Sequence, residues 1–247
     1  MTTQSTTADA ALATGSKGLS ARVLGVLFAP RATYADVAAR PRWLGAFLVV
    51  FLVSAAAATT FMSTEIGRNA VLDQQITQSE AWSGRPMNQQ QLDRMETMSK
   101  YFVYTTPVFQ LVFFILGSLL ISGVAFAVFN ALMGGDASFK QVFAVVVHSG
   151  VVLAALALFT TPLAYARETL TSATNLGVFF PFLADASFAA RLLGSIDLVY
   201  IWWMISISIG LGVLYRRRTG PIATTVLAIY VVIGVVIAAI KTAASGV

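Results

Sequence analysis

The chain has 247 residues, of which 57% are hydrophobic and only 11% are charged, and its formal net charge is +5. Soluble domains carry about a quarter charged residues, so this composition excludes an ordinary soluble protein and indicates an integral membrane protein. The Lys and Arg residues are scattered over loops and form no basic face interleaved with aromatics, so nucleic acid is not an expected partner. Cysteine is absent, which excludes disulfides and thiolate metal sites.

The N-terminal region lacks a long apolar segment. Residues 1–18 are rich in Ser, Thr and Ala without the basic start and apolar core of a signal peptide, and they are predicted to be a disordered tail. Residues 19–42 are predicted to form two short cytosolic helices at the membrane surface, interrupted at Pro30.

Each of these short helices has its own sequence pattern. In the first, Leu19, Val23, Val26 and Leu27 share one face and Arg22 lies elsewhere, which is typical of a helix lying on a membrane. In the second, Thr33 followed three residues later by Asp36 resembles a capping box with Asp in place of Glu.

Five apolar segments are predicted to cross the membrane, because a bilayer core about 30 Å thick needs roughly 20 apolar residues in a helix. They make residues 43–241 an all-α polytopic membrane helical bundle. The predicted spans are 43–63, 107–132, 141–165, 194–215 and 220–240.

Two connections between these spans carry recognisable signals. The polar segment 65–100 is predicted to be an outer helical loop, with a break around Ser83 and Pro86. Beyond the second span, Gly134 and Gly135 supply a tight turn. Ser138 with Gln141 then forms a capping box that starts the next helix.

Basic residues near the ends of the spans predict the orientation. With five spans the termini lie on opposite sides. The segments on the N-terminal side hold nine bases against three acids, whereas the other side holds seven of each. The positive-inside rule therefore predicts a cytoplasmic N-terminus and a C-terminus outside. The predicted basic inner surface comprises Arg40, Arg42, Lys140, Arg216, Arg217 and Arg218.

Two polar residues within the spans are candidates for an intramembrane polar site. Asp197 is a carboxylate inside the fourth span, which is a functional hypothesis by default. It also lies in the first turn of that helix, where the helix dipole favours an acid, so a structural contact to Arg191 or to the backbone is the alternative. His148, the one histidine, lies nearer mid-membrane and is either hydrogen-bonded to another helix or has a role as a proton relay or metal ligand.

Small residues at spacings of four predict close helix packing in the spans. They serve either the bundle itself or a self-association face. The predicted packing positions are Ser118, Ser122, Ser206, Ser208, Gly210 and Gly212.

No catalytic pattern accompanies these features. A G-x-S-x-G motif, a P-loop and a G-x-G-x-x-G motif are all missing, and a lone histidine cannot supply a metal site. The chain is therefore predicted not to be an enzyme and to hold no cofactor or metal.

Three stretches resemble the Yip1 family of five-span membrane proteins, particularly its bacterial branch. They are LFAPRATYADVAARPRWLGAF at 27–47, MGGDASFKQVFAVVVHSG at 133–150 and GSIDLVYIWWMISISIGLG at 194–212. The resemblance covers nearly all of 19–239 and implies a cytosolic N-terminus and a C-terminus across the membrane. Eukaryotic members resemble vesicle-traffic adaptors that bind Rab-type GTPases. This chain has Arg40, Pro41, Arg42 and Trp43 where their D-L-Y-G-P motif is expected, which favours a bacterial inner-membrane protein over GTPase binding.

The sequence thus predicts a non-enzymatic scaffold or adaptor that contacts membrane lipids and other membrane proteins, and that self-associates if its small-residue faces are free. The alternatives are a component of a small-solute, ion or proton transporter or channel, and a protein that binds or handles anionic lipid through Arg216, Arg217 and Arg218.

Overall fold

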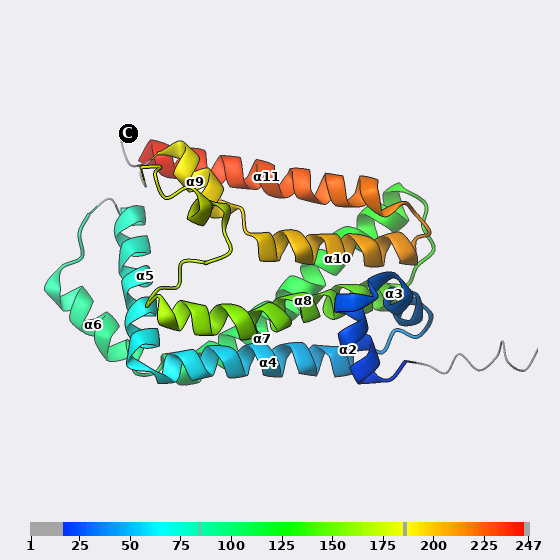
Figure 1. Cartoon of the computed structure of the whole chain (residues 1–247), viewed down its shortest axis with the longest axis horizontal. Coiled ribbons are helices and arrows are strands. Elements are labelled where there is room, and N and C mark those ends of the chain that lie inside the picture. Colours follow the sequence, from blue (N-terminus) through cyan, green and yellow to red (C-terminus); the bar gives the residue numbers. More distant parts are fainter. Residues whose placement is uncertain (1–16, 84, 185–186, 245–247) are drawn as a thin grey trace, which may run out of the picture.

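A helical bundle forms the body of the protein. The computed structural model describes residues 17–83, 85–184 and 187–244, and these contain no strand beyond one isolated bridge. The all-α fold is confirmed. The long helices run along the longest axis (Figure 1). They are α4 (Leu44–Ser63), α7 (Phe102–Phe126), α8 (Phe139–Ala166), α10 (Leu198–Leu214) and α11 (Thr219–Ala244), and α7 continues as a π-helix, η1 (Ala127–Leu132).

Most of these helices are long enough to span a bilayer. Within the described residues, four helical segments meet that requirement: Leu44–Ser63, Phe102–Leu132, Phe139–Ala166 and Thr219–Ala243. Helix α10 is equally apolar but has only 17 residues, which corresponds to about 25 Å. A polytopic membrane protein follows, and the crossing of the bilayer by α10 stays a prediction.

The fourth predicted span, residues 194–215, is interrupted in the structure. A separate helix, α9 (Phe188–Ser195), ends before Ile196, and α10 begins after Asp197. The break exists because Asn175 and Asp197 form an isolated antiparallel bridge that holds this backbone extended. Sequence hydropathy does not reveal such a long-range pairing.

The remaining elements gather at the two ends of the bundle (Figure 1). At one end lie α5 (Glu65–Ser83) and α6 (Gln89–Ser99), which fill the predicted outer loop, together with the segment that contains the 3-10 helix η2 (Leu176–Phe179). At the other end lie α2 (Leu19–Phe28) and α3 (Pro30–Ala39). Of the predicted N-terminal tail, residues 1–16 lie outside the described residues.

Helix α8 is the centre of the bundle. In its most apolar window 67% of residues are buried, against 17% for the α7 segment and 11% for α11, which therefore face lipid. Helices α4, α7, α10, α2 and α3 all pack against α8. The capping box of Ser138 and Gln141 predicted for its start is confirmed.

The predictions for α2 and α3 were wrong in detail. Of the apolar face predicted for α2, Val26 is buried and Val23 and Leu27 pack against the core, but Leu19 is 45% exposed. Arg22, which was predicted to lie off this face, is buried as well. Helix α3 starts after Ala29 without a side-chain cap, and Thr33 is buried inside it instead of capping it. The reason is that Asp36 pairs with Arg22, which allows an arginine to be buried.

Candidate functional site

A buried ion pair joins α2 to α3. The Arg22 Nε donates to Asp36 Oδ2 at 2.7 Å, and the two side chains are only 4% and 15% exposed. Arg40 reaches the other carboxylate oxygen, Oδ1, at 3.7 Å. Because an unpaired buried charge is costly, the pair holds the two helices in one arrangement.

Helix α3 is in turn fixed to the interior of the bundle. The Tyr34 and Ser206 hydroxyls are hydrogen-bonded at 2.7 Å, and Tyr34 is fully buried. Burial raises the pKa of Tyr34, and the bond to Ser206 opposes this only in part. Gly210 permits the close approach, since a Cβ there would lie 2.4 Å from Val145 and about 3 Å from the Tyr34 ring.

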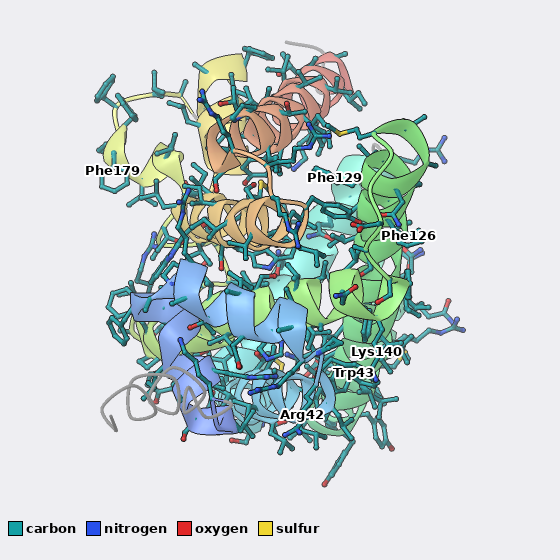
Figure 2. All side chains as sticks on the ribbon, turned by 90° about the vertical axis from the view of Figure 1, so that its right-hand side faces the viewer. Arg42, Trp43, Phe126, Phe129, Lys140 and Phe179 are labelled. Atoms are coloured by element: carbon teal, nitrogen blue, oxygen red, sulfur yellow. The ribbon has the colours of Figure 1, made fainter. Side chains whose placement is uncertain are left out.

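Hydrogen bonds between distant segments complete this end of the molecule. Gln141 of α8 donates to the Ala38 carbonyl at 2.9 Å, and Tyr215 donates to Asn130 Oδ1 at 2.7 Å. The three segments that the sequence placed on one side of the membrane are therefore joined into one rigid surface. All six predicted basic residues of these segments are exposed, and we call this set the basic face: Arg40, Arg42, Lys140, Arg216, Arg217 and Arg218. Figure 2 views the molecule from this end, with Arg42 and Lys140 labelled.

The predicted packing positions all lie inside the bundle. Ser122 and Ser208 are fully buried, and Ser118 and Ser206 are at most 4% exposed. Gly210 and Gly212 are also buried. These residues contact other helices of the same chain, so they leave no small-residue face of α10 open to a partner.

His148 lies at the buried core of α8. Its Nδ1 donates to the Ala144 carbonyl of the same helix at 2.7 Å, so its partner is not on another helix. Its Nε2 is buried without a hydrogen-bond partner in the described structure.

Asp197 is the N-cap of α10 and is 7% exposed. Its carboxylate accepts from the Val199 N–H at 2.8 Å, from the Thr174 hydroxyl at 2.8 Å and from the Ser172 hydroxyl. No ion pair with Arg191 occurs in the described structure. The acid therefore connects a loop to the start of a helix, and within the described residues no hydrogen bond joins it to His148.

A cavity of about 450 Å³ opens beside Asp197, between α4, α8 and the segment 170–174. Ser54, Thr160 and Thr161 are among the residues that line it, and so is Gln110 of α7. The Gln110 Oε1 is buried without a hydrogen-bond partner in the described part of the chain. Asp197 is among the residues that line this cavity.

Sequence reasoning missed the buried pair and the Tyr34 contact. The sequence pattern places Arg22 off the apolar face of a surface helix and Asp36 in a capping box. A charged pair 14 residues apart on two consecutive helices was the available signal. It becomes informative only once the two helices are known to enter the bundle.

These features define a class: a polytopic all-α membrane protein whose two N-terminal helices pack into one end of the bundle. The chain belongs to the Yip1 family, because the Yip1 domain matches residues 24–240, from within α2 to α11. This confirms the resemblance seen in the sequence. Searches of curated proteins and of solved structures returned no match.

Proposed function

We propose that the chain is a non-enzymatic scaffold or adaptor of the bacterial inner membrane, with its N-terminus in the cytoplasm and its C-terminus outside. The observation that carries this proposal is the basic face, held rigid by Arg22–Asp36, Tyr34–Ser206 and Gln141–Ala38. A preorganised surface loses little conformational entropy when another protein binds it. The nine bases on the same side support a cytoplasmic location.

The basic face is the surface proposed to bind other membrane proteins. The small residues of α10 are occupied within the chain, so partner helices have to use other surfaces. Self-association, if it occurs, would use the lipid-facing sides of α7 and α11, which are the least buried long helices of the described structure.

The test is purification of the tagged chain from native membranes in mild detergent, followed by identification of bound proteins. The variant Arg40→Gln/Arg217→Gln/Arg218→Gln should lose partners that the wild type retains. The matched control is Arg85→Gln/Arg94→Gln/Arg68→Gln, which removes the same charge at the opposite end. Equal partner sets for the two variants would refute binding at the basic face.

Transport is the second candidate, favoured by the cavity beside Asp197. Solute flux into proteoliposomes that disappears in Asp197→Asn, together with an absence of co-purifying partners, would support transport over the scaffold. The control is His148→Ala, whose site lies outside the residues that line this cavity.

A further inference from the structure

A second hollow lies on the lipid-facing side of the bundle, next to the basic face. It is a groove of about 480 Å³ between α4, α7 and the start of α8. Leu44 and Phe47 of α4 and Ile115 and Leu119 of α7 form its apolar walls, and Lys140 is its one charged lining residue. Leu44, Ile115 and Leu119 are 37–56% exposed, so the described chain leaves the groove open.

Aromatic residues are among those that line this groove, and their rings pack against one another. Trp43 packs edge-on against Phe143, with centroids 5.1 Å apart, and against Phe47 at 6.0 Å. Phe139 stacks on Phe143 at 6.2 Å, and Phe47 stacks on Phe114 at 4.9 Å. Because the rings fix one another, the groove is a preformed surface, and a flexible hydrocarbon chain can lie on it at small ordering cost to the protein.

Two basic side chains lie where the groove meets the rest of the basic face. Lys140 lines it directly, and Arg42 precedes Trp43 in the chain. Both are exposed, and within the described ranges neither forms an ion pair, in contrast to Arg40, which reaches Asp36. Figure 2 shows Arg42, Trp43 and Lys140 at the end that faces the viewer.

Arg42 and Lys140, two basic residues beside an apolar groove, would attract a ligand that carries an acidic group. Tryptophan is typically found at the depth of the lipid headgroups, which places the bases at the level of the phosphates. A basic pocket between transmembrane helices is also a recurring way to bind an anionic headgroup.

We propose that this groove binds one anionic glycerophospholipid. One of its two acyl chains lies against Leu44, Phe47, Ile115 and Leu119, and its phosphate headgroup is bound by Arg42 and Lys140. The site differs from the Arg216–Arg218 triplet that the sequence suggested for lipid, since the triplet does not line the groove. The inference is independent of the scaffold proposal.

The test is native mass spectrometry of the full chain, released from detergent after equilibration with mixtures of phosphatidylglycerol and phosphatidylcholine. The wild type should retain one phosphatidylglycerol in preference to phosphatidylcholine. Each base that contacts the headgroup in the groove contributes about a fivefold preference, so Arg42→Gln/Lys140→Gln should lower the preference about 25-fold. The matched control Arg217→Gln/Arg218→Gln removes the same charge from the basic face outside the groove and should retain the preference.

A second pair of variants tests the acyl chain. Leu119→Trp fills the groove and should reduce retention of both lipids, whereas Leu120→Trp, on the same helix at a residue that is 69% exposed and does not line the groove, should not. Binding of free phosphate would be insensitive to Leu119→Trp, so retained phosphatidylglycerol in that variant would overturn the proposal. Equal retention of the two lipids by the wild type, or an equal loss in both charge variants, would also overturn it.

Discussion

Removing one partner of the Arg22–Asp36 pair should destabilise the protein, and the loss should be larger when Asp36 is removed than when Arg22 is removed. In Asp36→Leu the Arg22 guanidinium, 4% exposed, loses its one ion-pair partner in the described structure, which costs about 3–5 kcal/mol. In Arg22→Met the Asp36 carboxylate is 15% exposed and keeps Arg40 at 3.7 Å, so the loss should be nearer about 2 kcal/mol. The double variant replaces both charges with apolar groups and should return to within about 1 kcal/mol of the wild type.

The measurement is the free energy of unfolding in mixed detergent and SDS micelles for the four members of this cycle. A local readout comes from Val26, which lies one turn after Arg22 and is 1% exposed. The chain has no cysteine, so Val26→Cys is a clean probe, and its maleimide labelling should speed up in the Asp36→Leu background. The reasoning would be refuted if Asp36→Leu lowered the free energy of unfolding by no more than about 1 kcal/mol, the value of a surface ion pair. It would also be refuted if the loss in the double variant equalled the sum of the losses in the two single variants.

Three other outcomes are expected from the same unfolding measurement. Gly210→Ala should lower the free energy of unfolding by about 1–3 kcal/mol, because its methyl group would meet Val145. The control Gly117→Ala, whose methyl group would have nothing within 4 Å, should leave the free energy of unfolding unchanged. Equal effects of the two variants would contradict the packing described. Asp197→Ala removes the N-cap of α10 and should lower the free energy of unfolding by about 0.5–2 kcal/mol. An unchanged free energy of unfolding would show that the cap is dispensable. Burial raises the folded-state pKa of Tyr34, so the unfolded chain loses that proton first as the pH rises. Stability should therefore fall above about pH 10 in the wild type and less in Tyr34→Phe, and parallel pH curves would contradict this.

Much of the fold is readable from the sequence because lipid imposes simple requirements. Uncharged runs such as 43–64 have to be helical, since a backbone in hydrocarbon can satisfy its hydrogen bonds only within itself. The capping box at Ser138 needs only residues that are neighbours in the chain. Local signals of this kind predicted the long helices and the start of α8.

The arrangement of α2, α3 and α10 depends instead on contacts between distant residues. Arg22 is buried because Asp36 is on the next helix, and the fourth span breaks because residue 175 pairs with residue 197. Hydropathy and helical periodicity describe one segment at a time, so neither pairing is visible to them. The lipid groove is likewise a product of three helices, and no one of them carries a signal for it.

The break between α9 and α10 also has a consequence for the order of assembly. The Asp197 N–H donates to the Tyr230 hydroxyl at 3.0 Å, and that hydroxyl donates to the Ser195 carbonyl at 2.9 Å. Tyr230 belongs to α11 and is synthesised 33 residues later. Until α11 arrives, these backbone groups need water as their partner. The start of α10 therefore reaches its final hydrogen bonding only after α11 has packed beside it.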